Sequence, residues 1–79
     1  MDNVNERLEA LFKDAFGVEK VTDEMSIETV EGWDSMAHVG LILALQKEFG
    51  VSISPMTALD LSDVGAIRHF LADYFENRS

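Results

Sequence analysis

Cysteine is absent from the 79-residue sequence and basic residues are scarce: six lysines and arginines stand against 15 acidic residues, a formal net charge of −9 at pH 7. Without cysteine, the chain can form neither a disulfide framework nor a thiolate metal site. Nucleic-acid binding needs clustered lysine and arginine, and an anionic membrane surface would repel so acidic a chain. We therefore expect basic protein partners and no nucleic acid.

Long apolar runs are absent as well. None approaches the roughly 20 residues that a membrane span requires. Residues 1–6 contain neither the basic region nor the apolar region of a signal peptide. These absences predict a cytoplasmic protein that does not span a membrane.

Catalytic motifs are missing too. His38 and His69 have no partner at a metal-ligand spacing, and we expect both on exposed helix surfaces. The acidic segment 23–34 is not an EF-hand loop, because Glu28 stands where that loop requires glycine. The sequence also has no glycine-rich phosphate loop and no G-x-S-x-G elbow. We predict no metal site and no catalytic residue.

What the chain does have is apolar content, 47% of its residues, which is too much for a disordered chain. Its length allows one domain, residues 1–79. Helical periodicity predicts long helices over 3–16, 35–49 and 62–77, and a short helix from Pro55 through Leu59. Residues 17–34 form a long loop, and 51–54 an extended connector. The predicted fold is therefore all-α, a small four-helix bundle with a long first loop.

Apolar spacing assigns the core faces of these helices. In the first helix, Asp2 or Asn3 is the expected cap, Gly17 the expected end, and one face carries Val4, Leu8, Leu11, Phe12 and Ala15. The last helix begins after Ser62 or Asp63 and repeats Val64, Ile67, Leu71, Tyr74 and Phe75. In the long loop the apolar residues that we expect to dip into the core are Val18, Val21, Met25, Ile27, Val30 and Trp33.

The helix 35–49 is apolar on two sides. It is therefore either buried around most of its circumference, or buried on one face while another face binds a partner. We assign Leu41, Leu45 and Phe49 to the core. We expect the other stripe to face the surface, where it could bind a partner; it contains Met36, Val39 and Leu43.

The pair Asp34-Ser35 opens this helix and has two interpretations. Aspartate and serine are favoured N-caps, and most such pairs do nothing more. Alternatively, the amides and positive dipole end of the helix would stabilise a phosphate added to Ser35. Asp34 would then hold the Mg²⁺ that a phosphoryl-transferring partner brings.

The stretch Gly32-Trp33-Asp34-Ser35-Met36 and the helix after it resemble the signature of acyl and peptidyl carrier proteins. The residues that carry the rest of the resemblance are Val39, Leu41, Ile42, Leu45, Glu48, Phe49, Val51 and Ile53. The resemblance implies a monomeric, non-catalytic carrier with 4′-phosphopantetheine esterified to Ser35, beside the motif residue Asp34. It also implies a phosphopantetheinyl transferase, a cargo-loading ligase or transferase, and downstream enzymes as partners. The cargo would be held as a thioester on the arm.

The expected partner surface combines Met36, Val39 and Leu43 with Glu31 and Trp33, since no lysine or arginine occurs between Val21 and Gln46. For Trp33 we favour packing over contact with the arm.

Ala37, His38 and Gly40 replace acidic positions of the fatty-acid type, which favours a dedicated pathway. The Gly-Trp-Asp-Ser context and the altered helix resemble free-standing peptidyl, aminoacyl or D-alanyl carriers more than the fatty-acid type. The cargo stays open among fatty acyl groups, amino acids, D-alanine and others. The alternative function is an acidic helical interaction module without a prosthetic group, in which Ser35→Ala costs about 1 kcal/mol as a lost cap.

Overall fold

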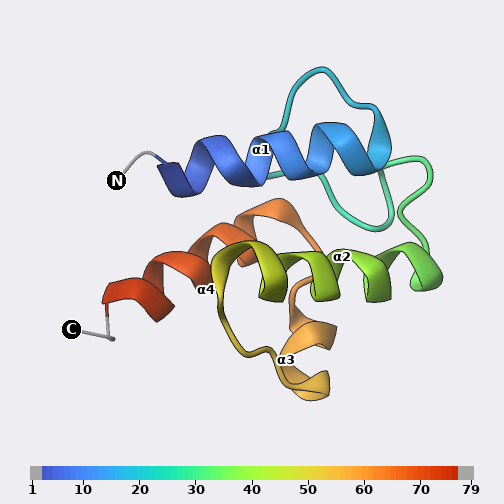
Figure 1. Cartoon of the computed structure of the whole chain (residues 1–79). Coiled ribbons are helices and arrows are strands. Elements are labelled where there is room, and N and C mark those ends of the chain that lie inside the picture. Colours follow the sequence, from blue (N-terminus) through green and yellow to red (C-terminus); the bar gives the residue numbers. More distant parts are fainter. Residues whose placement is uncertain (1–2, 77–79) are drawn as a thin grey trace.

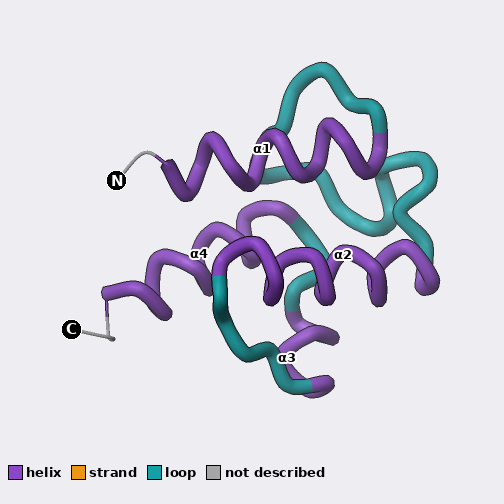
Figure 2. The backbone as a smooth tube through the Cα atoms, in the orientation of Figure 1, coloured by secondary structure: helices purple, strands orange, loops and turns teal. Residues whose placement is uncertain are grey.

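A computed structural model describes residues 3–76, and this range contains four helices and no β-strand (Figures 1 and 2). The helices are α1 (Asn3–Phe16), α2 (Ser35–Phe49), α3 (Pro55–Asp60) and α4 (Val64–Glu76). The all-α prediction of three long helices and one short one is confirmed. The loop between α1 and α2 makes one isolated antiparallel bridge, between Ser26 and Asp63.

The predicted helix bounds agree closely with the structure. Both ends of α1 and α2 are as expected. Helix α4 begins at Val64 because Asp63 is its cap: the Oδ1 atom of Asp63 accepts the Ala66 amide at 2.7 Å. Residue 77 and the side chains of Asp2 and Asn3, the expected caps of α1, lie outside the part of the chain that the structure describes.

Glycine ends the first two long helices. Gly17 and Gly50 have φ angles of 68° and 66°, the left-handed conformation that glycine adopts without strain. Their amides donate to the carbonyls of Lys13 and Gln46, each at 2.9 Å. These bonds satisfy carbonyl groups that the helix ends would otherwise leave without partners.

The core is built from one face of each long helix, together with residues of the loops. Helix α2 buries Leu41, Ile42, Leu45 and Phe49, which confirms the predicted core face. One detail of α1 was wrong: Ala15 is exposed, whereas the larger ring of Phe16 is half-buried against the core. The remaining buried apolar residues are Leu8, Phe12, Trp33, Val51, Ile53, Leu61, Val64, Ile67 and Leu71.

Helix α1 lies across the upper part of the view in Figure 1, with α2 and α4 beneath it and α3 at the bottom, below α2. Arg7 ties α1 to the end of α2: its Nε donates to Glu48 Oε2 at 2.8 Å. The Arg7 guanidinium also contacts the Glu48 carbonyl and lies 5.1 Å from the centre of the Phe49 ring. Because both charged groups are about half exposed, the ion pair itself adds little stability.

The long loop is pinned to α4 through backbone hydrogen bonds. The Val64 amide donates to the Met25 carbonyl at 2.9 Å, and the Gly65 amide donates to the Asp23 carbonyl at 3.2 Å. Several apolar side chains of the loop pack against the core, as predicted: Val18, Val21, Met25, Ile27 and Val30. The loop is therefore held in place along its length and delivers the chain to the start of α2.

Leu45 and Leu43 provide a matched test of this arrangement, since the first is 0% exposed and the second 60% exposed on the same helix. Leu45→Ala should lower the free energy of unfolding by about 2–5 kcal/mol, because it leaves a cavity in the core. Leu43→Ala should change it by no more than about 0.5 kcal/mol. Urea denaturation followed by circular dichroism measures both values. Equal losses would show that the core face of α2 is assigned incorrectly.

Candidate functional site

Asp34 is the N-cap of α2. Its backbone is extended, its Oδ1 atom accepts the Ala37 amide at 2.9 Å, and its carbonyl accepts the His38 amide at 2.8 Å. Ser35 is therefore the first helical residue, one position past the cap. The capping role that the interaction-module hypothesis gave to Ser35 belongs to Asp34, so Ser35→Ala removes no cap.

Ser35 is exposed, and none of the hydrogen bonds among the described residues involves its hydroxyl. The first two amides of α2, those of Ser35 and Met36, also have no acceptor within the described residues. Such amides, with the positive end of the helix dipole behind them, favour an anion placed next to them. The Ser35 oxygen is thus presented to solvent at a place that suits a phosphodiester.

The start of α4 shows the contrasting arrangement. Its first amides are all occupied: those of Val64 and Gly65 by loop carbonyls and that of Ala66 by the Asp63 carboxylate. The loop that covers α4 leaves the beginning of α2 uncovered. The two long helices that follow a loop therefore differ at their starts: α4 has its first amides occupied, and α2 has two free ones.

Trp33 anchors the segment just before this site. The indole ring is only 2% exposed, with the Phe12 ring edge-on at 5.3 Å and the Phe16 ring stacked at 5.6 Å. The packing interpretation of Trp33 is confirmed. The expectation that Trp33 contacts a partner directly is corrected, because the indole has almost no surface to offer.

His38 is half-buried, which corrects the expectation of an exposed histidine; His69 is exposed as expected. The Trp33 Nε1–H donates to His38 Nδ1 at 3.0 Å, and His38 Nε2 lies 2.8 Å from the Ala58 carbonyl oxygen. Because an indole only donates and a carbonyl only accepts, this network assigns the neutral tautomer with the proton on Nε2. No local pattern predicts this role, because Ala58 lies 20 positions away in a different helix.

A groove of about 540 Å³ runs beside Ser35 between α2 and α3. Its walls are mainly apolar: Ile27, Val39, Ile42, Leu43, Ile53, Pro55, Ala58 and Leu59, with the polar residues Ser35, His38, Gln46 and Ser62. Met36, Val39 and Leu43 are 83%, 62% and 60% exposed, so their predicted surface position is confirmed.

Helix α3 extends this apolar surface. Met56 and Leu59 are 76% and 74% exposed, and Leu59 lines the groove opposite α2. The exposure of Met56 and Leu59 was not predicted. A helix of six residues has too few turns for its apolar pattern to show which side faces the core.

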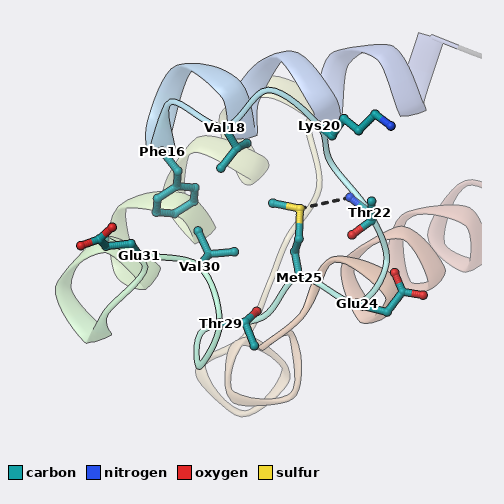
Figure 3. Close-up of a pocket in the computed structure, with 10 residues that line it drawn as sticks. Phe16, Val18, Lys20, Thr22, Glu24, Met25, Thr29, Val30 and Glu31 are labelled. Atoms are coloured by element: carbon teal, nitrogen blue, oxygen red, sulfur yellow. Dashed lines mark hydrogen bonds between the residues drawn. The ribbon is translucent and has the colours of Figure 1, made fainter.

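A second hollow, of about 690 Å³, lies on the loop between α1 and α2 (Figure 3). Phe16, Val18, Met25 and Val30 supply its apolar lining, and the Thr22 amide donates to the Met25 sulfur at 3.1 Å. Ser35 does not line it. Glu31 is an exposed residue at its edge and points away from the hollow in Figure 3.

Residues 3–76 bring no three histidine or acidic side chains together in a way that could hold a metal ion. Over the same range, no helix has both the length and the apolar character needed to cross a bilayer.

Comparison with known protein families matches residues 6–71 to the family described as phosphopantetheine attachment site. The chain belongs to this family. It is accordingly a phosphopantetheine carrier, in which 4′-phosphopantetheine is attached covalently. Carriers of this kind work with a phosphopantetheinyl transferase and with biosynthetic enzymes, and they are generally not catalysts themselves.

The structure fits this group. A phosphodiester needs an accessible hydroxyl and donors for its charged oxygens, and the start of α2 offers both. Ser35 is also one of the residues that line the apolar groove between α2 and α3.

Capping and attachment can be separated by mutation. Asp34→Ala should lower the free energy of unfolding by about 0.5–2 kcal/mol, because the Ala37 amide loses its acceptor. Asp34→Asn keeps an acceptor oxygen and serves as the control. Ser35→Ala should change stability by no more than about 0.5 kcal/mol. Thermal or urea unfolding of the unmodified proteins measures all three, and a Ser35→Ala loss as large as that of Asp34→Ala would contradict the cap assignment.

Proposed function

We propose that the Ser35 oxygen carries the 4′-phosphopantetheine and that the chain presents an acyl or aminoacyl cargo to partner enzymes. The observation that supports this assignment is the exposed, unbonded Ser35 hydroxyl beside two free amides at the start of α2. When bound, the group supplies a thiol on a flexible arm, and the cargo is held there as a thioester. The chain has no cysteine of its own to supply that sulfur.

Attachment forms a bond from the Ser35 oxygen to the phosphopantetheine phosphorus of coenzyme A. The bond from that phosphorus to the bridging oxygen of the pyrophosphate breaks, adenosine 3′,5′-bisphosphate leaves, and the hydroxyl proton is released. No carboxylate or imidazole of the described residues hydrogen-bonds this hydroxyl, so the base that takes the proton belongs to the transferase. Asp34 uses Oδ1 for its cap, and its other carboxylate oxygen has no partner among the described residues. That oxygen is available to the Mg²⁺ that the transferase brings.

Partner enzymes are proposed to bind the surface around Ser35. Met36, Val39 and Leu43 supply an apolar stripe, to which the exposed α3 residues Met56 and Leu59 add area. Asp34, next to Ser35, and Glu31, on the loop that leads to it, are exposed and form no ion pair among the described residues. A partner pocket of apolar residues with a basic rim complements this surface; such partners are the transferase, the cargo-loading enzyme and the downstream enzymes.

The same surface supports a proposal about the cargo and the pathway. An apolar groove of this size next to Ser35 suits an acyl group, whereas a small amino acid would stay on the exposed arm. A side chain at Gly40 would meet nothing within 4 Å, so packing within the chain does not require glycine there. This departure from the acidic fatty-acid pattern supports a dedicated pathway. We further propose that the carrier acts as a cytoplasmic monomer.

Mass spectrometry of the intact protein tests the attachment site. After incubation with coenzyme A, Mg²⁺ and a broad-specificity phosphopantetheinyl transferase, the wild type should gain one 4′-phosphopantetheine. Ser35→Ala should gain none. Ser54→Ala is the matched control, because Ser54 also stands at a helix start but its hydroxyl is occupied as the cap of α3. Equal labelling of Ser35→Ala and wild type would refute the assignment.

Charge reversal tests the partner surface. Glu31→Lys should lower the transferase kcat/KM by roughly tenfold at low salt, because the acidic surface steers the basic enzyme. Added salt should narrow the difference by screening the charges. Glu6→Lys makes the same change of net charge in the first turn of α1, next to the end of α2 that lies furthest from Ser35. If both variants are affected equally, net charge alone is responsible and Glu31 is not part of the surface.

A further inference from the structure

His38 connects three parts of the fold. It belongs to α2, accepts a hydrogen bond from the Trp33 indole in the long loop, and donates one to the Ala58 carbonyl in α3. Both ring nitrogens are thus occupied. The imidazole and indole rings are tilted by 28° from each other, with their centres 6.0 Å apart, so they meet edge to edge at this hydrogen bond.

Helix α3 is held by the buried residues Ile53 and Leu61 on either side of it and by the packing of Ala58, but it makes few hydrogen bonds to the rest of the fold. None of its six residues is buried. The bond to His38 is the only hydrogen bond in the described part of the chain that joins α3 to anything beyond residues 54–61. The position of α3 relative to α2 therefore depends strongly on this contact.

That position determines the shape of the groove beside Ser35. Pro55, Ala58 and Leu59 of α3 form one wall, and Val39 and Leu43 of α2 belong to the other. A loss of the tie at Ala58 would let the α3 wall move away from α2.

We propose that His38, in its neutral form with the proton on Nε2, is a positioning residue that fixes α3 against the Trp33 segment. It thereby sets the width of the groove and the cargo that the groove accommodates. The statement about cargo rests on the proposed function; the tie between Trp33, His38 and α3 does not.

Three variants separate the contributions. His38→Leu removes both hydrogen bonds and leaves an apolar side chain of similar bulk. His38→Gln keeps an oxygen acceptor and an N–H donor on one side chain, so it is the conservative replacement. Trp33→Phe removes the indole donor while it keeps an aromatic ring in the core.

The tie is tested on the unmodified protein by NMR. A long-range nitrogen–proton spectrum should show His38 protonated on Nε2 alone. Trp33 is the only tryptophan, so its indole N–H is assigned without ambiguity. Its exchange with water should accelerate roughly tenfold in His38→Leu and remain close to wild type in His38→Gln. The amides of α3 should become less protected in both His38→Leu and Trp33→Phe.

Three results would contradict the proposal that His38 connects Trp33 to α3. These are a His38 proton on Nδ1, equal indole exchange in wild type and His38→Leu, or a loss of protection in His38→Leu that is as large in α1 as in α3. The last would mean that the whole fold is weakened. The amides of α1 therefore serve as the internal control.

The statement about cargo is tested by using the transferase to attach the phosphopantetheine arm from acetyl-coenzyme A or from octanoyl-coenzyme A, each with its acyl group. The midpoints of thermal unfolding of the two products are then compared. The octanoyl form of the wild type should be the more stable one. This difference should fall to about half or less in His38→Leu and persist in His38→Gln. An unchanged difference in His38→Leu, or none in the wild type, would overturn the cargo statement. Failure of Ser35 to load at all would refute the proposed function and leave the NMR result standing.

Discussion

The burial of the Trp33 indole is the constraint on which the site depends. Phe12 and Phe16 of α1 hold the ring on one side, and His38 accepts its only polar hydrogen on the other. Because the indole is buried, the chain emerges at the surface immediately after it, where Asp34 caps α2 and Ser35 begins the helix. If α2 began one residue later, Ser35 would be the cap and its hydroxyl would be used there. The position of Ser35 therefore follows from the packing of the neighbouring Trp33 side chain.

The long loop has two effects on the helix starts around it. The carbonyl groups of Asp23 and Met25 accept the first two amides of α4, and this contact holds the loop against the core. The same loop then leads into α2 without covering the amides of Ser35 and Met36. Since free amides at an exposed helix start are solvated, the fold leaves them open at little cost, and a phosphate can replace the water.

The sequence predicted the helices and the Asp34-Ser35 pair because these depend on neighbours within a few positions. Periodicity separated Leu45 from Leu43 correctly, and glycine marked the ends of α1 and α2. What it did not predict depends on contacts between distant segments. The role of His38 requires α3 to lie beside Trp33, and the exposure of Met56 follows from where α3 docks. Neither position leaves a pattern in the local sequence.

The ion pairs of the described residues leave the acidic side chains of segment 24–34, which leads to Ser35, without a basic partner. Arg7 pairs with Glu48 at the far end of α2, and Arg68 pairs with Asp23 and Glu9 beside α4. Glu28, Glu31 and Asp34, by contrast, form no ion pair among the described residues. Unpaired like charges repel and weaken a small fold. A basic surface placed beside Ser35 would relieve this repulsion, so the charge that disfavours the isolated chain would favour such a complex.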